Sequence, residues 1–151
     1  MGFETVNPPL NAGAGFLTRP LLEAGFETEA VEADPSSSAD LVANLAAWRA
    51  EGLPGRGRAV AARVEEHVAR MREPRDAVFA DPPREGLSPV ARKALLRIRP
   101  RKLFLVSCDP ATFARDLASL LPEFRVASLA LLDLFPGTHH VETLATLERR
   151  R

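Results

Sequence analysis

The amino-acid sequence predicts an α/β fold with an open, mostly parallel sheet that ends in a C-terminal antiparallel strand pair. Two observations lead to this prediction. Short apolar runs alternate along the chain with longer stretches whose apolar residues recur at helical spacing. The last two apolar runs, 126–133 and 141–147, follow each other and are joined by Pro136 and Gly137, as is typical of neighbouring antiparallel strands.

Length and composition predict one domain spanning residues 1–151. The chain has 151 residues, of which 46% are apolar and 26% charged, and its 20 basic side chains balance its 20 acidic ones. A net charge of zero gives no global attraction for nucleic acid, so contact with RNA would need a local patch. Cys108 is the single cysteine, which excludes an internal disulfide or an iron–sulfur cluster held by this chain alone. Without a long apolar run or a secretory leader, we expect a cytoplasmic protein with no membrane partner.

Helical spacing predicts helices over 17–24, 39–50, 63–72, 88–98 and 111–121. Three of these helices have a candidate N-cap residue, namely Ser38, Ser88 and Asp109. After the last two caps a proline occupies the first helical position, where its missing N–H costs nothing. The proline-containing stretches 35–38 and 54–57 are predicted as loops.

Two buried strands are predicted over 76–80 and 103–106. The first is stopped by Pro82 and Pro83, and the second runs directly into Ser107 and Cys108. Ligands of open parallel sheets bind beyond the carboxyl ends of the strands. Asp81 and Cys108 both fall at such ends, so the sequence predicts a functional edge there.

A glycine turn near the N-terminus, with Gly13 and Gly15, precedes the predicted helix 17–24. Glycines at this place would let the backbone approach a ligand closely. Glu32 ends the next apolar stretch, where nucleotide-binding sheets place the acid that accepts ribose hydroxyls. Together they predict a cofactor site; the alternative is a plain strand-to-helix turn.

Asp81 and Cys108 are candidates for chemistry. Two prolines would hold the Asp81 carboxylate at a fixed angle, and Arg84 could pair with a phosphate or with a neighbouring acid. Cys108 precedes a predicted helix N-terminus, whose positive dipole end favours the thiolate. The alternative for Cys108 is a small buried apolar side chain.

Glu142 opens the last predicted strand and could act as a general base if its surroundings raise its pKa. The nearby His139 and His140 are neighbours in an extended segment, so their side chains would point to opposite faces. We therefore predict no metal site.

Three motifs occur in order along the second half of the chain. They are Asp-Pro-Pro-Arg-Glu-Gly-Leu at 81–87, Val-Ser-Cys-Asp-Pro-Ala-Thr at 106–112 with Arg-Asp-Leu at 115–117, and Asp-Leu-Phe-Pro-Gly-Thr-His-His-Val-Glu at 133–142. Together they resemble the catalytic domain of the RNA uracil-C5 methyltransferase family, which makes 5-methyluridine in tRNA and ribosomal RNA from S-adenosylmethionine. The resemblance covers roughly residues 10 to 151 and is strongest from Asp76 onward. It implies a Rossmann-like S-adenosylmethionine-dependent methyltransferase fold.

The resemblance also implies roles for residues. Cys108 matches the nucleophile that adds to C6 of the uracil ring, and Glu142 matches the group that removes the C5 proton. The implied contacts of S-adenosylmethionine are Asn11, Gly13, Gly15, Glu32 and Asp81. The implied partner is a tRNA or ribosomal RNA, with room for a separate RNA-binding chain, and no metal is implied.

The N-terminal part departs from the family pattern, so an N-terminally truncated relative with residues 1–30 eroded is expected. Thr5 stands where the family has a cofactor-binding glutamine, in a segment expected to precede the first strand. That strand would then fall on Pro8 and Pro9, which suit an inner strand poorly. The alternative function is a catalytically silent remnant or an RNA-binding accessory domain. A DNA cytosine-C5 methyltransferase is disfavoured, since its nucleophile follows proline rather than serine.

Overall fold

The structure, a computed structural model, describes residues 2–6, 15–133, 136–137 and 141–151. Their strands are β1 (Gly2–Val6), β2 (Glu27–Glu32), β3 (Arg56–Ala61), β4 (Ala77–Ala80), β5 (Lys102–Ser107), β6 (Phe124–Leu132) and β7 (Glu142–Arg149). Their helices are α1 (Thr18–Glu23), α2 (Pro35–Ala50), α3 (Val64–Arg70), α4 (Pro89–Ile98) and α5 (Pro110–Leu120). None of these helices is long and apolar enough to cross a membrane.

The strands form one sheet in the order β3-β2-β1-β4-β5-β7-β6. Strands β1 to β5 are parallel, whereas β7 runs antiparallel to both β5 and β6. This confirms the predicted α/β fold with a C-terminal antiparallel pair. The chain moves outward from β1 to β3 in one direction and from β4 onward in the other. A topological switch point therefore lies between β1 and β4, where open α/β sheets bind ligands.

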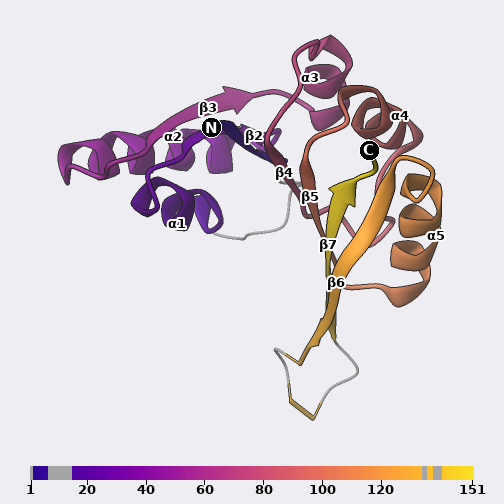
Figure 1. Ribbon diagram of the computed structural model, residues 1–151. Coiled ribbons are helices and arrows are strands. Elements are labelled where there is room, and N and C mark those ends of the chain that lie inside the picture. The colour runs from indigo at the N-terminus through magenta and orange to yellow at the C-terminus, as the bar shows by residue number, and fades with distance from the viewer. Residues whose placement is uncertain (1, 7–14, 134–135, 138–140) are drawn as a thin grey trace.

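Right-handed crossovers decide which face of the sheet each helix covers. Helices α1 and α2 connect strands that follow one another from β1 toward β3. Helices α3, α4 and α5 connect strands that follow one another in the opposite direction along the sheet. Figure 1 accordingly shows α1 and α2 grouped apart from α3, α4 and α5. The β6–β7 hairpin extends past the carboxyl edge of the parallel strands, beside the place where β5 leads into α5.

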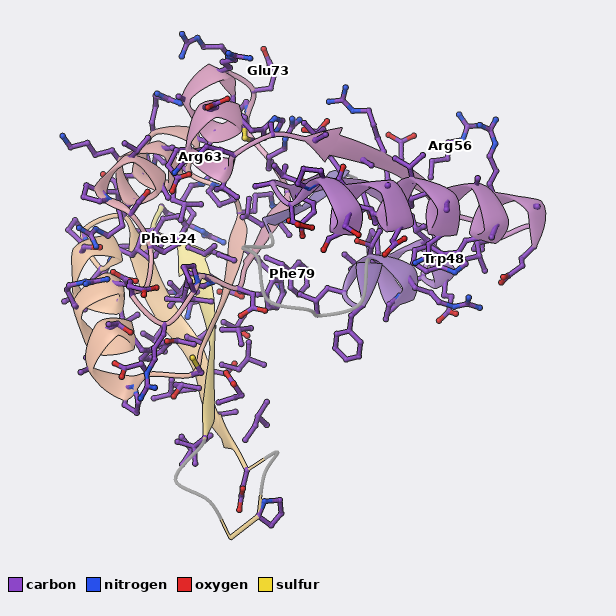
Figure 2. All side chains as sticks on the ribbon, turned by 180° about the vertical axis from the view of Figure 1, so that it is seen from behind. Trp48, Arg56, Arg63, Glu73, Phe79 and Phe124 are labelled. Carbon is purple, nitrogen blue, oxygen red and sulfur yellow. The ribbon has the colours of Figure 1, made fainter. Side chains whose placement is uncertain are left out.

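The main core lies between α4, α5 and strands β4, β5 and β7. Alternation in β5 buries Leu103 and Leu105, while Phe104 and Val106 on the other face are half-buried. Phe124 and Leu147 complete this core, which Figure 2 shows around the labelled Phe124. Burying each such side chain contributes about 1.5–3 kcal/mol, so the carboxyl ends of β4 and β5 rest on a stable layer.

The first strand differs from the prediction. The segment containing Thr5 was expected to precede the first strand, but Gly2–Val6 itself is β1 and pairs with β2 and β4. Pro8 and Pro9, on which the first strand was expected to fall, lie outside the described residues. Thr5 therefore lies in a strand between β2 and β4 and not in a segment that precedes the first strand.

Strand β3 was missed because its first residues were predicted as a proline–glycine loop. Gly55 does not serve a turn there: a Cβ atom at this position would lie 2.5 Å from the Phe26 carbonyl oxygen and 2.6 Å from the Leu22 Cα. The glycine permits a close backbone approach between the start of β3 and α1. Pro54 and Gly55 do lie in a loop, as predicted, whereas Arg56 and Gly57 belong to β3.

The N-cap of α2 also differs from the prediction. Asp34, not Ser38, accepts hydrogen bonds from the first turn, through the backbone N–H groups of Ser36 and Ser37, and the helix begins at Pro35. The residues predicted as a loop at 35–38 thus form the first turn. The caps predicted for α4 and α5, Ser88 and Asp109, are confirmed.

Candidate active site

Strand ends bring Asp81, Cys108 and Glu142 to the same edge of the sheet. Asp81 follows β4, Cys108 follows β5, and Glu142 opens β7. Ser107 pairs with Thr143 in the antiparallel ladder, so Cys108 and Glu142 are the next residues on the two adjoining strands. In an antiparallel pair, residues directly opposite each other lie on the same face. The predicted nucleophile and the predicted base are therefore neighbours.

Electrostatic interactions within this group confirm its proximity. Burial raises the pKa of the Cys108 thiol, and the nearby Glu142 carboxylate raises it further. Arg84 lowers the same pKa, and Asp81 raises it with a smaller effect. The net pKa of the Cys108 thiol is raised, because burial and the charges of Glu142 and Asp81 outweigh the opposing effect of Arg84.

The carboxyl groups of Glu142 and Asp81 are also shifted. Burial raises the pKa of Glu142, and the charge of Asp81 adds to this effect. Burial alone raises the pKa of Asp81. Both shifts make the carboxylates stronger bases than exposed ones, which is a property expected of groups that accept protons in a reaction.

The turn that carries Cys108 is anchored on both sides. Ser107 Oγ donates a hydrogen bond to the Asp109 carbonyl oxygen at 3.1 Å and accepts one from the Asp109 N–H at 3.3 Å. The Asp109 carboxylate caps α5 by accepting from the Thr112 N–H at 2.8 Å, and this bond lowers the pKa of Asp109. Cys108 is half-buried between these anchors, with a free thiol. It is not sealed beneath aliphatic side chains.

Arg84 lies beside the same turn. Its guanidinium is 3.9 Å from the Asp109 carboxylate, and its carbonyl oxygen accepts a hydrogen bond of 3.0 Å from Thr112 Oγ1. Of the two partners predicted for Arg84, a phosphate or a neighbouring acid, this structure contains the acid. The arginine side chain is 67% exposed, so the pair contributes little to stability and leaves the cation accessible.

Glu32 lies at the same edge, on the other side of the switch point. It is the last residue of β2 and is buried, and its Oε1 accepts a hydrogen bond of 2.8 Å from the Asp34 N–H. Because β1 separates β2 from β4, Glu32 and Asp81 stand about 10 Å apart, two strand spacings. The edge thus holds Glu32, Asp81 and Cys108 in sheet order.

Gly15 has a left-handed φ of +100°, and a Cβ atom there would lie 2.6 Å from the Trp48 ring. Close packing against α2 therefore accounts for a glycine at this position, independently of any ligand. The other two residues predicted for this part of the cofactor site, Asn11 and Gly13, lie outside the described residues.

Sequence reasoning assigned no role to Arg92 or Asp116. Asp116 is 1% exposed and forms a 2.8 Å ion pair with Arg92 from α4. A signal was present in the sequence, since Asp116 shares the buried face of α5 with Phe113 and Leu120. An acid on an apolar helix face needs partners, and those of Asp116 are the Leu87 N–H in the segment that follows Asp81 and the side chains of Arg92 and Arg115.

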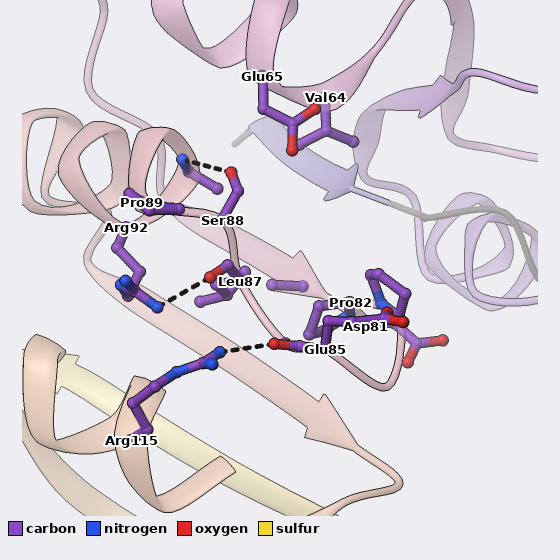
Figure 3. A pocket seen from close by; sticks show the side chains of 14 residues that line it. Val64, Glu65, Asp81, Pro82, Glu85, Leu87, Ser88, Pro89, Arg92 and Arg115 are labelled. Carbon is purple, nitrogen blue, oxygen red and sulfur yellow. Dashed lines mark hydrogen bonds between the residues drawn. The ribbon is translucent and has the colours of Figure 1, made fainter. Parts of the chain in front are cut away.

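A pocket of about 400 Å³ lies beside the segment that joins β4 to α4, and Figure 3 shows it from close by. Asp81, Pro82 and Ser88 line it together with Arg92 and Arg115, whereas Cys108 and Glu142 do not. The pocket and the thiol–carboxylate pair are therefore separate features that share Asp81. Within the part of the chain that the structure describes, no group of three or more side chains could hold a metal ion.

Comparison with known proteins identifies the family. The family model for tRNA (Uracil-5-)-methyltransferases matches residues 66–150, which is more than half of the chain. The chain belongs to this family. The match contains the strand ends that carry Asp81, Cys108 and Glu142.

Curated relatives are similar over nearly the whole chain. A protein of Aquifex aeolicus strain VF5 described as an uncharacterized RNA methyltransferase is 38% identical over 141 residues, 92% of this chain and 32% of the relative. One from Thermosynechococcus vestitus is 38% identical over 140 residues, 91% of this chain and 30% of the relative. The chain thus spans about a third of the length of these relatives.

Solved structures support the same fold. The Pyrococcus abyssi tRNA (uracil-54, C5)-methyltransferase, solved with S-adenosyl-L-homocysteine, is 28% identical with a TM-score of 0.73. The match covers 97% of this chain and 33% of that one. TrmN from Thermus thermophilus is 20% identical with a TM-score of 0.69, covers 99% of this chain and 44% of its own, and supports the fold alone. The architecture is therefore Rossmann-like, as expected.

Proposed function

We propose that this chain carries the catalytic centre of an S-adenosylmethionine-dependent methyltransferase that acts on C5 of uridine in RNA. The observation that carries the proposal is the juxtaposition of the Cys108 thiol and the Glu142 carboxylate across the β5–β7 ladder. Membership in the tRNA (Uracil-5-)-methyltransferase family supports the same reaction. A thiol and a carboxylate on adjoining strands can address opposite ends of one carbon–carbon double bond.

The chemistry needs both groups because C5 of uracil is a weak nucleophile. The Cys108 thiolate adds to C6, and the electrons of the C5–C6 double bond move onto C5 and the neighbouring carbonyl as an enolate. S-adenosylmethionine, when bound, supplies an electrophilic methyl group for C5. Glu142 then takes the C5 proton, the double bond re-forms, and the C6–S bond breaks to release the Cys108 thiolate.

The shifted pKa values of Cys108 and Glu142 suit these roles. A raised thiol pKa makes the thiolate scarcer at neutral pH but more nucleophilic once formed. A raised pKa makes the Glu142 carboxylate a better proton acceptor than an exposed glutamate. The Glu142 carboxylate disfavours ionisation of the Cys108 thiol, and the charge of Asp81 adds to the raised pKa of Glu142.

The cofactor would lie along the edge between Glu32 and Asp81. Carboxylates suit the hydroxyl and ammonium groups of S-adenosylmethionine, and Glu32 is buried at the end of β2 beside the switch point. A methyl donor held there would border the Cys108 site, because β4 and β5 are adjacent strands. The proposed contacts remain Asn11, Gly13, Gly15, Glu32 and Asp81.

The substrate would be an RNA whose target uridine is unstacked before it reaches Cys108. The similar Pyrococcus abyssi enzyme acts on tRNA, so we take a tRNA or ribosomal RNA as the substrate class. With 20 basic and 20 acidic side chains, the chain has no overall charge to attract a polyanion. A separate RNA-binding chain is therefore part of the proposal.

Methyl transfer tests the proposed function directly. The chain is incubated with tRNA or ribosomal RNA and S-adenosylmethionine labelled in its methyl group, and the digested nucleosides are separated. The label is expected in 5-methyluridine with the unaltered chain, and to fall by 10³-fold or more with Cys108→Ser or Glu142→Gln, since each removes one chemical step.

Calorimetry with S-adenosylmethionine serves as the accompanying measurement. Both variants should bind the cofactor as the unaltered chain does, because neither residue is among its proposed contacts. Label in another nucleoside, or full activity of Cys108→Ser, would contradict the mechanism. No cofactor binding at millimolar concentration, with RNA binding retained, would instead indicate a silent accessory domain.

A further inference from the structure

Asp116 is the most deeply buried acidic side chain of the described residues, and its carboxylate is hydrogen-bonded to the segment that joins β4 to α4 and to two arginines beside that segment. The residue lies in the middle of α5 and is 1% exposed. Its Oδ2 accepts a hydrogen bond of 2.6 Å from the Leu87 N–H. Its Oδ1 accepts from Arg92 at 2.8 Å and from Arg115 at 2.9 and 3.0 Å. These partners flank or contact the segment 81–88 that joins β4 to α4.

The two arginines that bind Asp116 also donate hydrogen bonds to the backbone of this segment. Arg92 donates a second hydrogen bond to the Leu87 carbonyl oxygen at 2.9 Å, and Arg115 donates one to the Glu85 carbonyl oxygen at 2.7 Å. Figure 3 shows both side chains reaching the segment from α4 and α5. With the bond from Thr112 to the Arg84 carbonyl, helix α5 holds three successive peptide units, from Arg84 to Leu87 with Gly86 between.

Gly86 fits the same contact from the other side. It is buried with a left-handed φ of +79°, and a Cβ atom on it would collide with the Asp116 carboxylate. An alanine at this position would be strained by its φ and by this collision. The lack of a side chain at Gly86 therefore allows the segment to lie directly against Asp116 of α5.

This contact joins the two elements that form the proposed catalytic centre. Helix α5 begins two residues after Cys108, and the segment 81–88 begins with Asp81 and includes Arg84. Both Asp81 and Arg84 influence the Cys108 thiol electrostatically. A rigid link between α5 and the segment fixes how far these charges stand from the sulfur atom.

We propose that Asp116 is a positioning residue, which holds Arg84 and Asp81 at a fixed place beside Cys108 by clamping segment 81–88 onto α5. The role in catalysis rests on the proposed function, but the positioning itself does not. Stability alone does not account for a buried carboxylate, because apolar residues of similar volume often stabilise a protein core as much as a buried ion pair does. The hydrogen bonds of Asp116 and its arginine partners account for the buried carboxylate better, because they hold the backbone of segment 81–88, which lies outside the helices and strands.

The test measures the rate at which iodoacetamide alkylates Cys108 as a function of pH, in a double-mutant cycle with Arg84. Arg84→Gln removes a cation that favours the thiolate, so it should slow alkylation at pH 8 about twofold in the otherwise unaltered chain. In an Asp116→Asn background the released segment no longer holds Arg84 in place. Arg84→Gln should then have no further effect.

Gly86→Ala provides a second route to the same state, and it should also abolish the effect of Arg84→Gln. Glu123→Gln is the matched acid-to-amide control, because Glu123 forms an exposed ion pair with Arg99 at 2.8 Å away from the segment. All rates are taken well below the melting temperature of each variant, so a loss of stability alone moves none of them. An Arg84 effect that persists unchanged in both backgrounds would overturn the proposal. Coupling without methyl transfer would uphold the positioning role and count only against the proposed function.

Discussion

At the scale of single residues, the proposed centre is a thiol and a carboxyl group whose pKa values are both raised. The Glu142 carboxylate raises the pKa of the Cys108 thiol, and burial raises the pKa of both. The Arg84 guanidinium acts in the other direction but does not outweigh these effects. A smaller fraction of the Cys108 thiol is therefore ionised at neutral pH than of an exposed cysteine, and Glu142 is a stronger base than an exposed glutamate.

Glu142→Gln should separate thiol reactivity from catalysis. Removal of the negative charge lowers the pKa of Cys108, so the thiolate fraction at pH 7.5 rises and iodoacetamide should react faster with this variant than with the unaltered chain. Release of free 5-methyluridine should be lost in the same variant, because the C5 proton is no longer removed. Glu23→Gln on exposed α1 is the control and should change neither rate. Slower alkylation of Glu142→Gln would contradict this description of the pair.

Asp81→Asn should stabilise the fold while impairing function. Burial raises the pKa of Asp81 in the folded chain, so the folded state binds the proton more tightly than the unfolded state does. The charged carboxylate therefore lowers stability above that pKa, and this cost disappears as the pH falls through it. We expect the melting temperature of Asp81→Asn to exceed that of the unaltered chain by about 2–4 °C at pH 7.5, the effect of about 1 kcal/mol.

The difference in melting temperature should vanish at pH 3, where Asp81 is protonated in both states. Asp40→Asn, at an exposed position on α2, is the matched control and should leave the melting temperature unchanged within 1 °C at both values. A lower melting temperature for Asp81→Asn at pH 7.5 would show that the carboxylate has a stabilising partner.

At the scale of elements, loops are positioned by caps and by close backbone approaches more than by helical or strand propensity. Asp34 caps α2 and also donates its own N–H to Glu32, so the start of this helix and the proposed cofactor contact share one turn. Asp109 caps α5 and donates its N–H to Ser107 Oγ, within the turn that carries Cys108. Capping residues thus link helix stability to the geometry of the strand ends.

Asp34→Ala should destabilise the chain by about 1 kcal/mol, because two N–H groups of the first turn of α2 lose their acceptor. Ser38→Ala should cost clearly less, since Ser38 lies inside the helix and caps nothing. Denaturant unfolding of the two variants measures this difference. An equal or larger loss for Ser38→Ala would favour the cap that the sequence predicted.

The elements of the second half could be predicted from the sequence because their signals are local. Ser88 and Asp109 precede prolines that suit the first helical position, and both caps are confirmed. The first half carries weaker signals. The predicted loop 54–57 extends two residues too far, into β3, and the α1 backbone that lies against Gly55 is a tertiary contact that the sequence does not show. The same holds for Asp116, whose partners are 24 and 29 residues away in the chain.

At the scale of the whole molecule, the sheet order determines which distant residues meet. The reversal between β1 and β4 places Glu32 and Asp81 on either side of β1, and the antiparallel return of β7 brings Glu142 beside Cys108. The sequence predicted that these residues share one edge, since strand ends and the family motifs pointed there. It could not predict the clamp from α5, because a helix face shows which side chains are buried but not what they contact.

The most direct measurement is mass spectrometry of the chain after incubation with 5-fluorouridine RNA and S-adenosylmethionine. Fluorine at C5 cannot leave as a proton does, so elimination is blocked and the Cys108–C6 bond should persist. We predict a covalent adduct whose peptide maps to Cys108, which Cys108→Ser does not form. An adduct that persists unchanged in Cys108→Ser would contradict the account.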